Sequence, residues 1–438
     1  MKSTSLLASL LVGAMRLCRR IGWPASIARM SDQDLAVYSA GAAAILGGRA
    51  WLAWRRGPSW PRVHAAWRAA IGDEALRDRI AGRLHADDRF ELIADGPAAF
   101  ARRAEWIAGA RQTIDLAFYY VQADDTGRDL VQALADGVRR GVRVRLLVDA
   151  IASWRKSIEV PGTDALLRQA EAAGIQLRRW TDAQRPHDGN HRKMMIVDGQ
   201  RAVVGGRNIA DHYRGTAWRD LDLLLQGPVV TPLAQLYDAL WQAPPQAAGG
   251  PHSRSPWVDH VPARILDDTP MRFALAAIGA AQGSVELELA YLVAQPPLID
   301  ALTAAARRGV AVRVLTNSAE SNDLPFIAWT CADALCRLQA EGVPLRLRRG
   351  AGCTLHPKYL VVDTRWVSIG SHNLDYHSSR LCGETNLVVD DAPLAAALRS
   401  FFDSGWQLAT PPADGELQRW HAGAGASRLF DRLFRDYE

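Results

Sequence analysis

The stretch HRKMMIVDGQRAVVGGRN, residues 191–208, decides the fold, because a second copy follows it in the same chain. That copy, HPKYLVVDTRWVSIGSHN, occupies residues 356–373. In both, a His is followed by a Lys two positions on, an Asp seven positions on, and a Gly shortly before the closing Asn. Each of these residues lies 165 positions from its counterpart (356 − 191). Two copies in register indicate duplicated halves that share one site.

Each copy predicts a strand, a turn and a second strand. The apolar runs MMIVD (194–198) and YLVVD (359–363) end on Asp, as buried strands do before a turn, and the next apolar runs return as second strands. His and Lys are two residues apart, so on an extended backbone their side chains project to the same face. The duplication therefore predicts two imidazoles and two ammonium groups around one small volume.

These side chains suit the chemistry of a phosphate group. Two cations can hold phosphate oxygens. A neutral imidazole can attack phosphorus, while a second, protonated imidazole can give a proton to the leaving oxygen. A lone His is more often structural, but two at matched positions with matched Lys partners favour catalysis. The arrangement requires neither a metal ion nor another cofactor.

The same order of elements runs through both halves. Helices alternate with strands, which predicts an α/β fold with largely parallel sheets covered on both faces. We expect helices at 100–110 and 130–141 and strands at 113–121, 142–150 and 174–180 in the first half, then helices at 273–281 and 298–309 and strands at 285–293, 310–318 and 342–349 in the second.

Composition narrows the class of protein. The 438 residues suffice for two domains of ordinary size. The 52 Lys and Arg against 47 Asp and Glu give a net charge of +5, which is compatible with an anionic membrane or substrate but too small to indicate nucleic acid. The five cysteines have neither disulfide-framework nor zinc-site spacing, so reduced thiols are expected at Cys18, Cys331, Cys336, Cys353 and Cys382.

The N-terminal segment, residues 1–83, is predicted to be a helical extension. Its apolar runs (6–15 and 35–48) are followed by a region rich in Trp and Arg that extends through Trp60 and Trp67, as in a helix at a membrane interface. The alternatives are a signal-peptide core, although a cleavage site is missing, and a helical extension packed on the protein core. The remaining predicted boundaries are a first half at 84–243, a linker at 244–262, a second half at 263–410 and a C-terminal tail at 411–438.

The doubled pattern H-x-K-x4-D-x6-G-(G/S)-x-N resembles the HKD signature of the phospholipase D superfamily. The surrounding sequence, including NHRKMMIVDGQRAVVGGRNIADHY and SHNLDYHSSRLCGETNLVV, resembles the bacterial cardiolipin synthase branch over roughly residues 84–408. The resemblance implies two tandem α-β-α sandwich halves related by a pseudo-two-fold axis, with one shared active site.

The resemblance also implies roles for individual residues. His191 is expected to attack phosphorus and form a phosphohistidine, and His356 to act as acid and then base, although the sequence itself leaves these two roles interchangeable. A carboxylate after each motif is expected to orient a catalytic His, and Asp220 and Glu384 lie at the right distance; for Asp220, a surface strand charge is the alternative, since Asp222 shares its face. The catalytic set implied is His191, Lys193, Asp198, His356, Lys358 and Asp363, with phosphate binding or support from Asn208, Asn373, Gly206, Ser371, Asp220 and Glu384.

Some of these residues also have an interpretation from position alone. Asp198 and Asp363 end strands before a turn, which indicates bonding to backbone. Gly206 allows a close backbone approach, and Ser371 replaces it in the second copy. Tyr119 and Tyr120 end a strand directed toward the site and are further candidates for substrate contact.

The expected activity is transfer of a phosphatidyl group to phosphatidylglycerol, giving cardiolipin, with phosphatidylglycerol or phosphatidylethanolamine as donor. A phospholipase D that forms phosphatidic acid shares the intermediate and differs in using water. A nuclease of the same superfamily is disfavoured by the small net charge and by the absence of a dense basic patch. A non-catalytic scaffold would need a degraded motif, and both motifs are intact. The expected location is the bacterial inner membrane, with the catalytic part facing the cytoplasm.

Overall fold

The computed structural model describes residues 60–181, 188–242, 255–260, 268–293 and 295–423. All of these lie within Ser59–Asp431, which forms one compact unit. The two apolar N-terminal runs, Cys18 and most of the predicted linker lie outside the described residues. Among the helices of the described ranges, none is both long enough and apolar enough to cross a bilayer.

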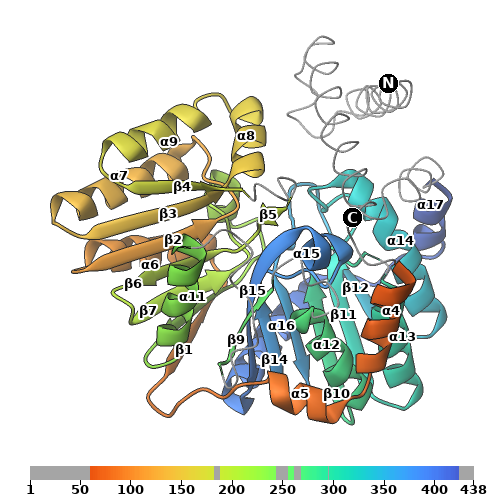
Figure 1. The fold of residues 1–438 in the computed structure, drawn as a ribbon. Coiled ribbons are helices and arrows are strands. Elements are labelled where there is room, and N and C mark those ends of the chain that lie inside the picture. Colours follow the sequence, from red (N-terminus) through yellow and green to blue (C-terminus); the bar gives the residue numbers. More distant parts are fainter. Residues whose placement is uncertain (1–59, 182–187, 243–254, 261–267, 294, 424–438) are drawn as a thin grey trace. The chain divides into compact units, whose positions relative to one another are not determined.

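The first half is built on a seven-stranded sheet with the order β1-β8-β7-β6-β2-β3-β4 (Figure 1). Its strands are Arg89–Ile93 (β1), Thr113–Phe118 (β2), Arg143–Asp149 (β3), Gln176–Trp180 (β4), Met194–Val197 (β6), Arg201–Gly205 (β7) and Asp222–Gln226 (β8). Its helices are Gly96–Ala108 (α6), Asp125–Arg139 (α7), Ala150–Glu159 (α8), Thr163–Ala172 (α9), Asp211–Arg214 (α10) and Val230–Gln242 (α11).

The second half repeats this plan around the order β12-β11-β10-β13-β14-β15. Its strands are Trp257–His260 (β9), Ser284–Leu289 (β10), Ala311–Asn317 (β11), Leu345–Arg348 (β12), Lys358–Val362 (β13), Trp366–Gly370 (β14) and Cys382–Asp390 (β15). Its helices are Thr269–Ala280 (α12), Pro296–Arg307 (α13), Pro325–Ala340 (α14), Tyr376–Arg380 (α15), Ala392–Leu408 (α16) and Glu416–Gly423 (α17), and Trp60–Ala70 (α4) and Glu74–Ile80 (α5) join them from the N-terminal side.

The core is divided into layers by the two sheets. One apolar cluster joins the first sheet to α6, α7 and α9, and another joins the second sheet to α12, α13 and α14. A third cluster contains α11, α16 and strand residues of both halves, so these two helices lie between the sheets. Several helices begin at an Asp whose carboxylate accepts a backbone N–H three residues on, as Asp95, Asp124 and Asp268 do. The result is the predicted pair of α-β-α halves.

The prediction of largely parallel sheets is wrong, because both sheets are mixed. β2, β3 and β4 are parallel neighbours, as are β10, β11 and β12, where helices make the crossovers. The motif strands are antiparallel, with β6 beside β7 and β13 beside β14. The reason is the tight turn between them: Asp198 and Gly199 both have positive φ, and so short a connection can join only antiparallel strands.

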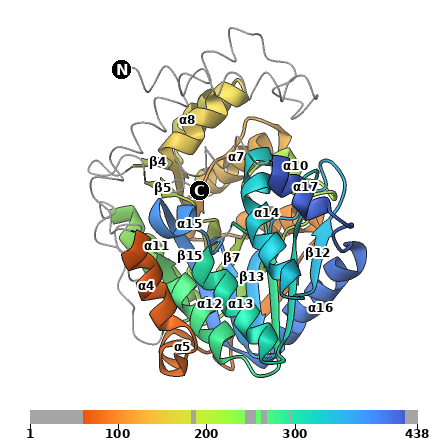
Figure 2. The same ribbon diagram turned by 90° about the vertical axis from the view of Figure 1, so that its right-hand side faces the viewer.

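Three segments predicted to lie outside the halves are part of the second one. β9, inside the predicted linker, is antiparallel to β15. In the N-terminal extension, α4 and α5 contact α12, as Figure 2 shows. Trp67 is fully buried in that core, so its assignment to a membrane interface is wrong and the packed-extension alternative describes it. In the predicted tail, α17 contacts α14.

The halves are joined by backbone pairing at the ends of their motifs. Gly189–Asn190 (β5), from the first half, is parallel to the start of β15 in the second. In the opposite direction, Arg219 of the first half forms a parallel bridge with Leu355. In each half, the residues just before the motif His therefore pair with backbone of the other half.

Candidate active site

Each motif His is followed by a Lys that bonds back to it. His191 lies between β5 and β6, and Lys193 directly precedes β6. The ammonium of Lys193 donates a 2.6 Å hydrogen bond to the carbonyl oxygen of His191. In the second half, Lys358 begins β13 and donates a bond of the same length, 2.6 Å, to the carbonyl of His356. The two copies thus have matching local geometry.

The carboxylates that orient the imidazoles come from the opposite halves. Nδ1 of His191 lies 2.9 Å from Oε1 of Glu384, which belongs to β15 of the second half. Nδ1 of His356 lies 2.9 Å from Oδ2 of Asp220, which precedes β8 of the first half. Both carboxylates are fully buried. The alternative reading of Asp220 as a surface strand charge is therefore wrong.

Backbone bonds reinforce this exchange. The N–H of His191 donates to the carbonyl of Gly383, at 2.9 Å, and the N–H of His356 donates to the carbonyl of Arg219, at 2.7 Å. In each case the accepting residue directly precedes the carboxylate that holds the same imidazole. Backbone and side chain of one half therefore fix the His of the other, and the site requires both halves.

Gly206 is needed for the approach of Asp220. A Cβ at this position would lie 2.3 Å from Oδ1 of Asp220 and 2.8 Å from the carbonyl oxygen of His356. In the second copy, the hydroxyl of Ser371 instead accepts a bond from the N–H of Thr385, at 3.1 Å. The Gly and Ser at matched positions thus have different local roles beside the two carboxylates.

Burial sets the protonation of the imidazoles. It lowers the pKa of His191 to about 4 and that of His356 to about 4, although Glu384 and Asp220 act in the opposite direction. Burial raises the pKa of Glu384 and of Asp220, but the bonded imidazole outweighs it and holds each carboxyl pKa below its usual range. At neutral pH the carboxylates are ionised and accept Nδ1–H, which leaves the Nε2 lone pair of each neutral imidazole available.

The two lysines influence each other across the halves. Burial lowers the pKa of Lys193 to about 7 and that of Lys358 to about 8, while the nearby carboxylates raise both. The charge of Lys358 also lowers the pKa of Lys193 and of His191. A site that holds cations under such mutual repulsion and desolvation favours a bound anion, which restores their charge.

Asp198 and Asp363 lie at the far ends of their strands. Asp198 follows β6, whose first residue follows Lys193, so extended backbone separates the two residues by about 16 Å. The Asp198 carboxylate accepts the backbone N–H groups of Arg111, Gln112 and Thr113. Asp363 accepts those of Gln282, Gly283 and Ser284. These aspartates tie each motif turn to the neighbouring strand and lie away from the imidazoles.

The two motif asparagines differ in their bonds. The side chain of Asn208 accepts the N–H of Tyr119, at 3.1 Å, and donates to the hydroxyl of Tyr213, at 3.0 Å. The Oδ1 atom of Asn373 is buried and has no hydrogen-bond partner. Asn208 therefore holds Tyr119 and Tyr213 in place, while Oδ1 of Asn373 can still accept a hydrogen bond.

Aromatic rings surround the imidazoles. Tyr119, a predicted candidate, is edge-on to His191 with ring centroids 5.0 Å apart. Sequence reasoning missed Tyr213, Trp218 and Tyr291, whose centroids lie 5.6, 5.4 and 6.3 Å from that of His356. The signal that could have found Tyr291 is the repeat itself, because Tyr291 lies two residues beyond β10 just as Tyr120 lies two residues beyond β2. Tyr213 lies on α10 and Trp218 between α10 and β8. The residues 165 positions on are Ser378 and Gly383, so the repeat does not mark these two aromatics.

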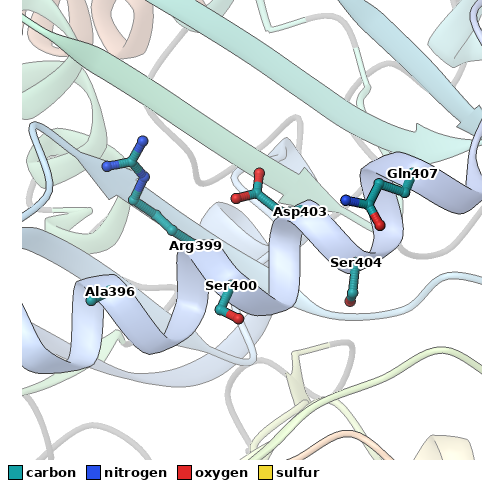
Figure 3. A pocket seen from close by; sticks show the side chains of 6 residues that line it. All are labelled: Ala396, Arg399, Ser400, Asp403, Ser404 and Gln407. Atoms are coloured by element: carbon teal, nitrogen blue, oxygen red, sulfur yellow. The ribbon is translucent and has the colours of Figure 1, made fainter.

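An open groove of about 530 Å³ follows α16 and is separate from these residues (Figure 3). All of its lining side chains come from that single helix. Asp403, which lies between Arg399 and Gln407 in this view, is ion-paired with Arg313 at 2.7 Å. The groove has no His or Lys and is no candidate for the chemistry.

Residues 104–241 and 274–406 match the family described as "Cardiolipin synthase, PLD-like domain". Cardiolipin synthase A of Pseudomonas entomophila (strain L48) is 29% identical over 369 residues, covering 80% of this chain and 75% of that protein. Cardiolipin synthase 1 of Staphylococcus epidermidis (strain ATCC 35984) is 26% identical over 347 residues, covering 73% of this chain and 68% of that protein.

A solved structure has the same fold. It is the crystal structure of phosphatidylserine synthase from Haemophilus influenzae Rd KW20, with a TM-score of 0.67 at 13% identity. The match covers 85% of this chain and 100% of that chain. At this identity the likeness concerns the fold alone.

Proposed function

Because the chain belongs to the family described as cardiolipin synthase, PLD-like domain, we propose that it is a phosphatidyltransferase that makes cardiolipin through a phosphohistidine. The observation that carries the proposal is the pair of buried imidazoles, each held at Nδ1 by a carboxylate of the opposite half. This arrangement presents two Nε2 atoms beside two lysines. One nitrogen can bond to phosphorus while the other handles the proton of an alcohol.

In the first step, Nε2 of His191 attacks the phosphorus of the donor phospholipid. A P–N bond forms and the P–O bond to the headgroup alcohol breaks, while His356 donates its proton to the leaving oxygen. The anionic phosphodiester favours the protonated form of His356 as it binds, because an opposite charge offsets the cost of burying an imidazolium. Lys193 and Lys358 stabilise the charge on the non-bridging oxygens.

In the second step, His356 accepts a proton from a hydroxyl of phosphatidylglycerol, and that oxygen attacks the phosphohistidine. The P–N bond breaks, cardiolipin leaves, and both imidazoles return to their starting state. With phosphatidylglycerol as donor the balance is two phosphatidylglycerol molecules to one cardiolipin and one glycerol. Phosphatidylethanolamine as donor would release ethanolamine instead. No step requires a metal ion.

A second part of the proposal concerns the lipid surface. Helix α8 exposes Trp154 (49%) and Ile158 (46%), one turn apart, whereas Leu408 (70%) is on α16. Arg155 and Lys156 lie between the two α8 residues in sequence, and the ammonium of Lys156 is 4.8 Å from the ring centroid of Tyr120, beside the site. Both cations are ion-paired with Glu159, Arg155 at 3.5 Å and Lys156 at 2.6 Å, so the exposed apolar pair carries the argument. Exposed Trp beside polar groups is suited to a membrane interface. We assign α8 as the surface that brings the site to its lipids.

The test uses the purified full chain with phosphatidylglycerol vesicles in EDTA, with and without phosphatidylethanolamine, followed by lipid mass spectrometry. Cardiolipin should form in EDTA, and His191→Ala and His356→Ala should each abolish it. His85→Ala, which changes an exposed His, is the matched control and should retain activity. Phosphatidic acid alone would mean that water is the acceptor and that the chain is a phospholipase. Cleavage of DNA without any lipid product would overturn the lipid assignment.

A further inference from the structure

Two tyrosines occupy matched positions in the halves but have different partners. Ile114 pairs with Val197, and Val285 pairs with Val362, so the motif repeat makes β2 and β10 equivalent. Six residues beyond those positions stand Tyr120 and Tyr291. Both rings are buried at the site.

The charged groups beside these tyrosines differ. The hydroxyl of Tyr120 bonds to the hydroxyl of Tyr213, at 3.3 Å, and the ammonium of Lys156 lies by its ring. The hydroxyl of Tyr291 donates to Oδ1 of Asp323, at 2.8 Å. The Tyr120 side therefore has an ion pair, because Lys156 also bonds to Glu159 at 2.6 Å. The Tyr291 side, which is the side of His356, has the carboxylate of Asp323.

Asp323 belongs to a loop that is held in place by buried hydrogen bonds. The hydroxyl of Ser321 donates to the carbonyl of Arg348, at 2.8 Å, and accepts the N–H of Ser318, at 2.9 Å. The carbonyl of Ser321 in turn accepts the hydroxyl of Thr354, at 2.8 Å. A loop anchored at these points has little freedom to move its carboxylate.

The same network reaches His356. Oδ1 of Asn317 accepts the N–H of Leu355, at 2.8 Å, and Nδ2 of Asn317 donates to the carbonyl of Leu355, at 2.7 Å. The hydroxyl oxygen of Ser321 lies 3.1 Å from Oδ1 of Asn317, so its one proton is shared between this acceptor and the carbonyl of Arg348. One amide side chain thus links the Asp323 loop to the residue that precedes His356. The negative charge of Asp323 raises the pKa of both His356 and Lys358, which places it within electrostatic reach of them.

We propose that Asp323 and Tyr291 form a subsite for the hydroxyl-bearing headgroup of the alcohol on which His356 acts. The inference rests on the proposed function, because the alcohol is the leaving group of the first step and the acceptor of the second. An ionised carboxylate has about four lone-pair sites, of which Tyr291 uses one, so it can accept the hydroxyls of a glycerol headgroup. The half-buried position of Asp323 allows the headgroup to reach it. Water has no second hydroxyl with which to use this subsite.

The experiment separates recognition of the alcohol from the chemistry at phosphorus. The donor is phosphatidyl-p-nitrophenol, whose leaving group needs no headgroup subsite, and free glycerol, ethanolamine or water alone is the acceptor. In the wild type, glycerol should compete with water for the phosphohistidine and yield phosphatidylglycerol. Asp323→Ala should still release p-nitrophenol in a His191-dependent reaction, and its ratio of glycerol capture to hydrolysis, which does not depend on the rate of release, should fall by about tenfold or more.

Two further variants keep the test decisive. Tyr291→Phe should lower the same ratio by a smaller factor, because it removes only the bond that orients the carboxylate. Asp87→Ala, which removes an exposed carboxylate before β1, should leave the ratio unchanged. An unchanged ratio in Asp323→Ala and Tyr291→Phe, with His191-dependent p-nitrophenol release, would overturn the subsite. A selective loss of ethanolamine capture would also overturn it, in favour of an ammonium site. No His191-dependent p-nitrophenol release in the wild type would instead refute the proposed function.

Discussion

The carboxylate of Glu384 lies 2.9 Å from Nδ1 of His191, although 193 residues separate them in the chain. His356 and Asp220 form the reciprocal pair across 136 residues. Each half therefore supplies an imidazole to the site and a carboxylate to the imidazole of the other half. Neither half alone contains an oriented His, which is the physical reason for a site that depends on the duplication.

Replacement of either carboxylate by its amide should reduce transfer without unfolding the protein. In Glu384→Gln and Asp220→Asn the partner imidazole loses the acceptor that fixes its tautomer, and kcat should fall by about 10²- to 10⁴-fold. Steady-state cardiolipin formation measures this, and circular dichroism checks the fold. Asp222 is the matched control carboxylate, since it pairs with Arg103 and Arg207 rather than with a His. Asp222→Asn should lower the melting temperature but leave kcat of the folded protein near the wild-type value. A near-normal kcat in Glu384→Gln would contradict the role assigned to Glu384.

Gly206→Ala adds one methyl group, but it should lower both the stability and the activity of the protein. The added methyl group would meet Asp220 at 2.3 Å, so the carboxylate that holds His356 must shift. We expect a loss of unfolding free energy of about 1–3 kcal/mol, together with lower kcat. Gly215→Ala is the control, because its nearest contact is 3.4 Å and its φ is negative. Equal behaviour of the two variants in denaturant unfolding and lipid turnover would refute the close approach.

Binding of an anionic diester should weaken as pH rises through the range 7 to 8. Lys193 and Lys358 have pKa values lowered to about 7 and about 8, so both are charged below this range and lose their charge above it. Diethyl phosphate keeps one negative charge throughout, so its titration reports the protein alone. Its affinity should fall by up to about tenfold per pH unit for each lysine that must be protonated.

The matched variant for this titration is Lys358→Met, which should bind diethyl phosphate weakly at pH 6 and show a shallower pH dependence. Isothermal titration between pH 6 and 9 makes the comparison. Affinity that is constant over that range in the wild type would show that the lysines do not hold the phosphate.

The α8 surface predicts a specific effect on vesicle binding. Trp154→Glu combined with Ile158→Glu should weaken sedimentation with anionic vesicles, since both apolar side chains would be lost from the interface and two negative charges added. Leu408→Glu changes a large apolar residue that is exposed on α16, away from α8, and this variant should bind like the wild type. Hydrolysis or transfer of a water-soluble diester should be unaffected in the double variant. Equal vesicle binding of the wild type, the double variant and Leu408→Glu would reject α8 as the membrane surface.

Much of the fold followed from local patterns. The helices and strands predicted on either side of each motif are present, because amphipathic and apolar runs bounded by turn residues specify elements locally. The share of parallel pairing was predicted wrongly, because the alternation of helices and strands describes only β2–β4 and β10–β12. The motif strands return through a tight turn, as predicted. Trp67 was misplaced because an aromatic beside Arg has the same local signature at a membrane interface and in a packed helix.

The sequence by itself determined which residues the proposed chemistry uses. His191, Lys193, His356 and Lys358 are marked by a spacing that occurs twice, and duplication is visible without coordinates. Only the tertiary structure decided that Glu384 belongs to His191 and Asp220 to His356. The offsets of 29 (220 − 191) and 28 (384 − 356) fit pairing within each motif equally well. The exchange arises from backbone bonds between β5 and β15 and between Arg219 and Leu355, and such long-range pairing leaves no periodic trace in the chain.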